Sequence, residues 1–273
     1  MSGQKKFFLR NSLNLIAVLL FFADFAAAQV IVLPNAHSHN DYLQKHPLTD
    51  ALNNGFASIE ADVFLIKGEL RVAHVHPFFR KPKTLETLYL KPLYDSIGLH
   101  KGSVYSNSKQ EIILLIDIKS NASETYESLK PLLEKYKSVV SNFKNGIITA
   151  GAVTIVLTGN KPYDDIKKET MRYAFIDEDL RNMNSEKSTT VFVMASSKYS
   201  NVLKWKGKGN IPAEEKQKLT ALVNQAHLQG KKVRLWASPE NTVVWEELLN
   251  CGVDLINTDK LEEFKKFLIQ PHQ

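Results

Sequence analysis

The sequence predicts an α/β fold: a closed barrel of eight parallel strands with helices outside it, the (β/α)8 or TIM barrel. Three observations lead to this prediction, namely the length of the chain, its alternation of strand-like and helix-like segments, and the apolar character of the strand-like ones. The chain has 273 residues, of which 44% are hydrophobic and 23% charged, as in an ordinary globular protein. A single barrel of this kind takes about 250 residues.

The first 28 residues are expected to be a secretory signal peptide that takes no part in the fold. Basic residues precede an uncharged apolar run, Leu15 to Ala23, and Ala26-Ala27-Ala28 offers a small-residue cleavage site. The run is much shorter than the ~20 apolar residues that span a bilayer. The alternative is an uncleaved membrane anchor. Cleavage after Ala28 leaves one domain, residues 29–273, and predicts a secreted or periplasmic protein.

The charge balance argues against a nucleic-acid-binding protein. The formal net charge is +6, and the lysines are scattered through helix-like segments instead of forming a basic stripe. A mild positive excess is compatible with an anionic substrate. The single cysteine, Cys251, cannot form an intramolecular disulfide and is expected to pack in the core. The chain is expected to be a monomer.

Eight strand-like segments follow one another after residue 29. Most are continuous apolar runs, which are typical of parallel strands buried on both faces. They are Val30 to Asn35, Ser58 to Phe64, Ile112 to Ile118, Ala152 to Leu157, Tyr173 to Ile176, Val191 to Ala195, Lys232 to Ala237 and Asp254 to Asn257.

Amphipathic segments with helix start and stop signals separate these strands. A short extra strand, Leu70 to Ala73, and a loop-rich insertion, Phe78 to Asn107, are expected at the end of the barrel that carries the chemistry. The expected helices are Pro47 to Leu52, Glu124 to Val140, Pro162 to Lys168, Pro212 to Gln229, Asn241 to Asn250 and Lys260 to Leu268.

Three pairs of polar residues at i, i+2 spacing occur within 40 residues, and side chains two apart on a strand point the same way. The first pair follows an apolar run, so we expect both of its imidazoles where a strand gives way to a loop, facing one pocket. The pairs are His37 with His39, Glu60 with Asp62, and His74 with His76.

Carboxylates are embedded in apolar strand-like runs at three positions, Glu60, Asp62 and Asp117. Such groups are costly to bury unless they are paired or hold a cation. Because barrel active sites form at the carboxyl ends of the strands, the three can converge on an all-oxygen site for Ca²⁺ or Mg²⁺. The alternatives are a salt-bridge network with Arg71 or Arg80 and, for Asp117, a structural ion pair with Lys119.

The order of these motifs resembles the phospholipase C-like phosphodiesterase superfamily, which includes the glycerophosphodiester phosphodiesterases and sphingomyelinase D. The matching positions are Ala36-His37, Glu60-x-Asp62, Gly68-x-x-x-Val72-x-His74, Asp117-x-Lys119 and the segment from Gly252 to Asp259. More closely, three stretches resemble the altered-inheritance-of-mitochondria protein six family within that superfamily: His37 to Tyr42, Leu88 to Leu93, and Val233-Arg234-Leu235-Trp236.

The resemblance implies a metal-dependent phosphoric diester hydrolase that acts on a glycerophosphodiester or a phospholipid-type substrate. It implies His37 and His74 as the acid/base pair. Glu60, Asp62 and Asp117 match the ligands of one divalent cation, Mg²⁺ or Ca²⁺.

The resemblance also implies substrate-binding residues. Lys119 matches a lysine that contacts the phosphate, and Trp236 matches an aromatic residue that lines the substrate pocket, the alternative being a core tryptophan. Asn40 matches a polar position beside the first histidine. His39 is interpreted as substrate-contacting, as supporting its neighbours or as solvated, and His76 has the same alternatives.

Departures from the pattern leave the substrate open. His-Ser-His stands where glycerophosphodiesterases have His-Arg-Gly, and His76 follows the second histidine where they have an aspartate. One alternative function is a zinc-dependent hydrolase of the amidohydrolase or polymerase-and-histidinol-phosphatase type, although few histidines follow to complete its ligand set. Another is a secreted binding protein without turnover.

The insertion carries aromatic residues that have two interpretations. Phe78, Phe79 and Tyr89 either touch a membrane surface transiently or pack against the barrel.

Overall fold

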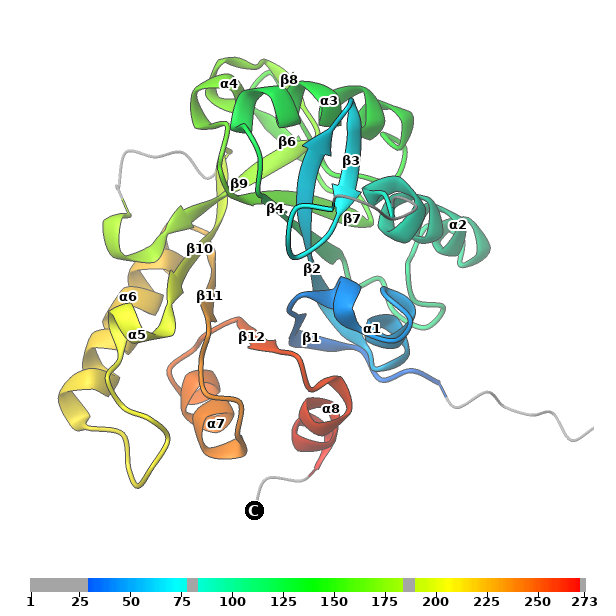
Figure 1. The fold of residues 1–273 in the computed structure, drawn as a ribbon. Coiled ribbons are helices and arrows are strands. Elements are labelled where there is room, and N and C mark those ends of the chain that lie inside the picture. The colour runs from blue at the N-terminus through cyan, green and yellow to red at the C-terminus, as the bar shows by residue number, and fades with distance from the viewer. Residues whose placement is uncertain (1–28, 78–82, 184–189, 271–273) are drawn as a thin grey trace, which may run out of the picture.

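The structure is a computed structural model and describes residues 29–77, 83–183 and 190–270. Eight strands follow one another around a ring, each parallel to its neighbours, and helices lie outside the ring (Figure 1). The ring closes because β1 pairs with both β2 and β12. The predicted barrel is therefore confirmed. Its strands are β1 (Leu33–Ser38), β2 (Phe56–Ile66), β4 (Ile112–Ile118), β7 (Val153–Gly159), β9 (Ala174–Asp179), β10 (Phe192–Lys198), β11 (Lys232–Trp236) and β12 (Leu255–Thr258).

Helical segments connect most of the strands. Between β9 and β10 the described residues contain only the 3-10 turn η3 (Leu180–Asn182). The other segments are η1 (Asp41–Leu43), α1 (Thr49–Asn53), η2 (Glu86–Leu90), α2 (Lys91–Leu99), α3 (Ala122–Lys135), α4 (Tyr163–Lys168), α5 (Tyr199–Val202), α6 (Ala213–Leu228), α7 (Thr242–Asn250) and α8 (Leu261–Ile269).

No helix within the described ranges has both the length and the apolar character needed to cross a membrane. The predicted signal peptide, residues 1–28, lies outside the described residues.

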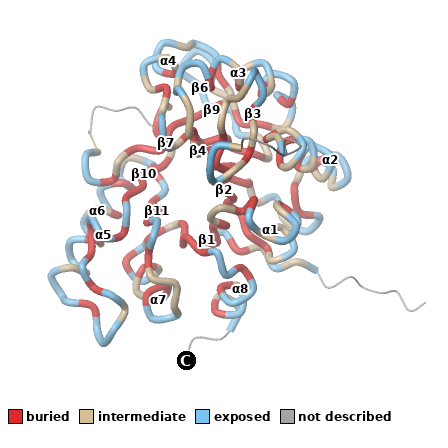
Figure 2. The backbone as a smooth tube through the Cα atoms, in the orientation of Figure 1, coloured by how far each residue is buried: buried red, intermediate tan, exposed pale blue. Residues whose placement is uncertain are grey.

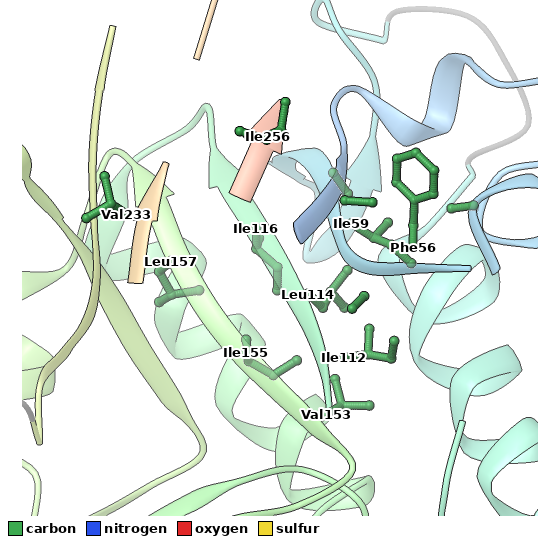
Figure 3. Packing of buried hydrophobic residues seen from close by; sticks show 14 of the residues in the cluster. Phe56, Ile59, Ile112, Leu114, Ile116, Val153, Ile155, Leu157, Val233 and Ile256 are labelled. Atoms are coloured by element: carbon green, nitrogen blue, oxygen red, sulfur yellow. The ribbon is translucent and has the colours of Figure 1, made fainter. Parts of the chain in front are cut away.

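Alternation along the strands builds two separate apolar regions. On β4, Ile112, Leu114 and Ile116 point outward and pack between the barrel and its helices (Figure 3). Ile113 and Leu115 point inward, where they meet side chains from β7, β10 and β12 in a separate cluster. Buried residues accordingly follow the ring of strands, and exposed residues lie on the outer helices (Figure 2). The next inward position on β4 is Asp117, at the carboxyl end of the strand.

The first strand differs from its prediction. It begins at Leu33 and runs to Ser38, whereas the sequence predicted Val30 to Asn35. The apolar residues before Leu33 precede the strand, although Val30 and Val32 still pack against the core. As a result, His37 lies within β1 and not in the loop that follows it, while His39 is the first residue after the strand.

The insertion between β2 and β4 is more regular than predicted. After β3 (Glu69–Val72), which pairs antiparallel with β2, the chain forms η2 and then α2. Tyr89 is fully buried, and its hydroxyl donates to Asp41 Oδ2 at 3.0 Å. Of the two interpretations of Tyr89, membrane contact or packing against the barrel, the structure shows the second. Phe78, Phe79 and Arg80 lie outside the described residues.

A second small sheet was not predicted. It consists of β5 (Asn142–Lys144), β6 (Ile147–Thr149) and β8 (Met171–Arg172), with β5 in the middle. It accounts for the early end of α3 at Lys135, because the chain must leave the helix to reach β5. The sheet lies outside the barrel ring and contributes nothing to the pocket described below.

Candidate active site

One pocket of about 410 Å³ gathers eight of the nine predicted site residues at the carboxyl ends of the barrel strands. They reach it from β2 and β4, from the end of β11, and from the segments that follow β1, β3 and β4. These residues are His39, Asn40, Glu60, Asp62, His74, Asp117, Lys119 and Trp236.

Three carboxylates form the centre of the pocket. Glu60, Asp62 and Asp117 each offer an oxygen within 4.8 Å of the others, and Asp62 faces Asp117 in the register of β2 and β4. The inward positions of two neighbouring strands therefore place the cluster. Burial raises the pKa of Glu60 and of Asp117, because both carboxylates lose contact with water.

Two oxygens of this cluster make no hydrogen bond in the described part of the chain, and one of them, Asp117 Oδ1, has no ion-pair partner there either. Asp62 Oδ1 and Asp117 Oδ1 are buried without a hydrogen bond in the described part of the chain. Lys119 Nζ lies 2.7 Å from Asp117 Oδ2 and 3.2 Å from Asp62 Oδ1, so one ammonium group faces two carboxylates. Arg71 pairs with Glu69 at 2.7 Å and does not join the cluster. Carboxylate oxygens that converge in this way fit a hard divalent cation.

Gly159 leaves the room that Asp117 needs. Its φ angle of +69° is strained for other residues, and a Cβ atom there would overlap Asp117 Oδ1 and lie 2.7 Å from the Ile118 carbonyl oxygen. The absence of a side chain at the end of β7 therefore sets the position of one carboxylate.

His39 presents one ring nitrogen to the pocket. Its Nδ1 lies 2.8 Å from Asp259 Oδ1, and its Nε2 lies 3.9 Å from Glu60 Oε2. Burial alone would lower the pKa of His39, but the hydrogen bond to Asp259 and the charge of Glu60 outweigh burial and raise it. The adjacent residue, Asn40, takes the left-handed conformation, with φ at 46°, and its backbone N–H donates to Glu60 Oε2 at 2.7 Å.

His74 lies at the rim of the same pocket with 62% of its side chain exposed. Its Nδ1 is 3.4 Å from Asp62 Oδ2 and 3.2 Å from the hydroxyl oxygen of Tyr42. The Tyr42 hydroxyl also lies 2.7 Å from Asp62 Oδ2. Tyr42 thus links the second histidine to the carboxylate cluster.

His37 does not reach the pocket, so the expectation that His37 and His39 face it together is wrong. His37 lies within β1 and is 0% exposed, whereas His39 follows the strand and lines the pocket. Its Nδ1 is 2.7 Å from Ser58 Oγ, and its Nε2 is 3.0 Å from Arg234 Nη1. Both ring nitrogens are therefore occupied by protein groups.

Comparison with known protein families adds an independent finding. Residues 24–177 match the family described as the AIM6-like phosphodiesterase domain. The chain belongs to this family. It is 31% identical over 273 residues to altered inheritance of mitochondria protein 6 of Eremothecium gossypii, covering 87% of this chain and 70% of the relative. The corresponding protein of Lachancea thermotolerans is 29% identical, with 86% and 65% covered.

Two solved structures are also similar to this AIM6-like family member. One is a glycerophosphodiester phosphodiesterase from Parabacteroides distasonis, at 16% identity and a TM-score of 0.49, which covers 86% of this chain and 96% of that one. The other is a glycerophosphodiester phosphodiesterase from Agrobacterium tumefaciens, at 11% identity and a TM-score of 0.44, with 87% and 99% covered.

Three residues of the site in this family member were not singled out from the sequence: Tyr42, Arg234 and Asp259. All three lie inside stretches that carry the family resemblance. For Arg234 a signal was present, because a charged residue between Val233 and Leu235 interrupts an apolar strand. For Asp259 none was, since its contact with His39 joins residues 220 positions apart.

Proposed function

We propose that this chain is a metal-dependent phosphoric diester hydrolase that acts on a small-molecule or lipid phosphodiester. The observation that carries the proposal is the convergence of three carboxylates beside two imidazoles in one pocket, with Asp117 Oδ1 buried and without a hydrogen bond or ion pair in the described part of the chain. Membership of the AIM6-like phosphodiesterase family points to the same class of reaction.

Glu60, Asp62 and Asp117 would hold one divalent cation, Mg²⁺ or Ca²⁺, through oxygen ligands. When bound, such a cation acts as a Lewis acid toward a phosphoryl oxygen. Lys119 Nζ, 2.7 Å from Asp117, is placed to stabilise the negative charge that builds up at phosphorus. The Trp236 side chain, 39% exposed at the pocket wall, offers an apolar surface to the alcohol part of the substrate.

His39 and His74 would carry the proton transfers, with His39 taking the place that the sequence suggested for His37. Asp259 holds Nδ1 of His39, so Nε2 is left to exchange a proton with the substrate. One imidazole removes the proton from the attacking water or from a neighbouring hydroxyl of the substrate, and a new P–O bond forms. The other imidazole protonates the leaving oxygen as its P–O bond breaks. The products are an alcohol and either a phosphomonoester or a cyclic phosphate.

A zinc-dependent hydrolase fits this geometry less well. Zinc held by His37 and His39 would need a free nitrogen on each ring, yet both nitrogens of His37 are within hydrogen-bond distance of Ser58 and Arg234. Within the described ranges, the group of residues that could hold a metal consists of carboxylates alone.

The direct test is an assay of the purified chain against a panel of phosphodiesters, with Mg²⁺, with Ca²⁺ and after chelation. We expect cleavage that requires a divalent cation and falls by at least ~10³-fold in Glu60→Gln, because one ligand charge is lost. Tight binding of diesters without product would support a binding protein instead. Cleavage that persists after chelation, or stoichiometric zinc, would contradict the proposal.

We further propose that residues 29–273 are the mature, exported domain and act as a monomer, without a nucleic-acid partner. The apolar run and small-residue site before Gln29 support export. The amino-terminal sequence of the protein recovered from the producing cell and its mass in solution test both points. Sedimentation with phospholipid vesicles tests whether transient contact with a membrane surface accompanies catalysis.

A further inference from the structure

A single arginine lies inside the barrel directly beneath the pocket. Arg234 occupies an inward position of β11 and is 4% exposed. Its Nη1 lies 3.1 Å from Asn257 Oδ1 and 3.0 Å from His37 Nε2, and its Nε lies 3.4 Å from Ser196 Oγ. These contacts come from three other barrel strands, β1, β10 and β12, so the guanidinium group is fixed in one orientation.

The hydrogen bond to Arg234 determines the state of His37. A guanidinium nitrogen can only donate, so Nε2 of His37 must accept. Nδ1 therefore carries the proton and donates to Ser58 Oγ at 2.7 Å. Burial, together with the neighbouring charge of Arg234, holds the pKa of His37 well below its usual value. His37 is thus a neutral hydrogen-bond acceptor that orients Arg234.

The remaining end of Arg234 faces the pocket. Arg234 belongs to the pocket wall together with Glu60 and Lys119. Its Nη2 makes no hydrogen bond to any residue in the described ranges, and it is not among the buried atoms that lack a partner. A rigid N–H donor with positive charge is therefore presented at the pocket floor.

The charge balance of the site favours a further positive group such as the Arg234 guanidinium. The three carboxylates Glu60, Asp62 and Asp117 would balance one divalent cation and the ammonium of Lys119. The negative charge of a phosphodiester would then have no counterpart among these groups. Arg234, which also lies near the buried carboxyl group of Asp177, supplies a positive charge at this place.

We propose that Arg234 binds a non-bridging phosphoryl oxygen of the substrate through Nη2, and that His37 is the positioning residue that aims it. The inference rests on the proposed phosphodiesterase function and adds to it the group that recognises the phosphoryl oxygen from the barrel side. Arginine suits this task because its planar fork can donate to protein groups and to a phosphate oxygen at once.

The test is binding of inorganic phosphate to the purified, cation-loaded chain, measured by titration calorimetry. Arg234→Gln is expected to weaken phosphate binding by about 10- to 100-fold, the usual effect of losing a charged hydrogen bond. Arg234→Lys is expected to weaken it by about tenfold, because lysine keeps the charge and loses the fixed geometry. Affinity for the divalent cation alone should stay equal or rise, since a positive neighbour is lost in the first variant. Arg181→Gln, which removes a surface arginine paired with Asp179, is the matched control.

Two substitutions of His37, compared by phosphate binding, test its role as the positioning residue. His37→Gln keeps an oxygen that can accept from Arg234, whereas His37→Leu keeps only the bulk. The leucine variant should weaken phosphate binding several-fold more than the glutamine variant, with cation affinity retained in both. Should an arginine variant fail to fold, as judged by circular dichroism, this pair decides the question.

Each outcome separates the inference from the function on which it rests. Phosphate affinity that is unchanged in Arg234→Gln, or undetectable in the wild-type protein, overturns the inference. Diester cleavage at the wild-type rate in Arg234→Gln overturns it too and leaves the proposed function standing. If phosphate binding depends on Arg234 but the protein cleaves no diester of the panel, the inference about Arg234 is supported and the proposed phosphodiesterase function is contradicted.

Discussion

Two levels of polar residues inside the barrel differ in how completely their hydrogen bonds are satisfied. At the lower level, both ring nitrogens of His37 and the Nε and Nη1 atoms of Arg234 have protein partners. At the upper level, the buried Asp117 Oδ1 has neither a hydrogen bond nor an ion pair among the described residues, and Asp62 Oδ1 has only the ion pair with Lys119. Because a buried polar atom without a partner costs free energy, natural proteins retain one where a ligand completes it. The contrast separates residues that support the site from residues that meet the substrate.

Below both levels the barrel interior becomes apolar. Ile113, Leu115, Val156, Met194 and Leu255 close the barrel toward the amino ends of the strands. Their burial stabilises the fold without any requirement for a partner. Substitutions in this apolar cluster should therefore affect stability, and substitutions in the pocket at the carboxyl ends of the strands should affect ligand binding and turnover.

The two histidines of the His37-Ser38-His39 sequence give the sharpest form of this comparison. His39→Gln should lower kcat by about 10³-fold, because the half-buried ring that lines the pocket exchanges the proton. His37→Gln should lower kcat by less than about tenfold, because the glutamine oxygen still accepts from Arg234. Steady-state kinetics of both variants with one diester measures this. A greater loss in His37→Gln would return the acid/base role to the buried ring.

The apolar cluster should respond in the opposite way. Ile113→Ala removes three carbon atoms from a packed site and should lower the free energy of unfolding by about 3 kcal/mol. Urea denaturation measures the loss. Calcium or magnesium affinity should change less than about twofold, because Asp117 lies four residues further along β4. A large loss of cation affinity would show that the two regions are not separable.

Gly159 tests whether packing alone can disturb the cation site. Gly159→Ala should push Asp117 aside and lower cation affinity by about tenfold, by a change of position and not of charge. The matched control is Gly68→Ala, at a φ of +80° with no atom within 4 Å of the added Cβ. It should cost about 1 kcal/mol of stability through backbone strain and leave cation affinity alone. Equal effects of the two substitutions on cation affinity would contradict this account of Gly159.

Trp236 should have the smallest effect. Trp236→Leu removes part of the pocket wall, so KM should rise by about three- to tenfold for diesters with bulky alcohol groups, with little change in kcat. Tyr94→Leu, at an exposed aromatic position on α2 outside the pocket, should leave KM unchanged. A fall in kcat without a change in KM would give Trp236 a different role.

Much of the fold was predictable because its signals are local. All eight barrel strands were predicted from apolar runs, and the errors concern the residues at which the strands begin and end. The helix at Lys91–Leu99 was missed because the whole segment from Phe78 to Asn107 was interpreted as a loop-rich insertion. Leu85, Tyr89 and Leu93 are all buried and lie four residues apart, and this helical spacing was the signal for a helix in the segment. The β5–β6 hairpin was also missed, although Asn145-Gly146 is a strong turn signal.

Most residues of the site could be predicted from the sequence, but not how far each of them lies from the open end of the barrel. Period-two alternation predicted that His37 and His39 lie on one face of the chain. It could not tell which of them reaches solvent, because that depends on register. His37 lies level with Ser58 on one neighbouring strand and Asn257 on the other, within the barrel. Residues far apart in the sequence set that level.

The central claim is that the upper level is completed by a hard cation and a phosphoryl group. A crystal structure of the chain with Mg²⁺ or Ca²⁺ and phosphate tests it most directly. We predict one ion bound by Glu60, Asp62 and Asp117 at ~2.0–2.6 Å, the distances these cations take to oxygen. We also predict phosphate oxygens on Lys119 and Arg234, with His37 unchanged beneath. An ion held by His37 and His39, or phosphate away from Arg234, would contradict the account.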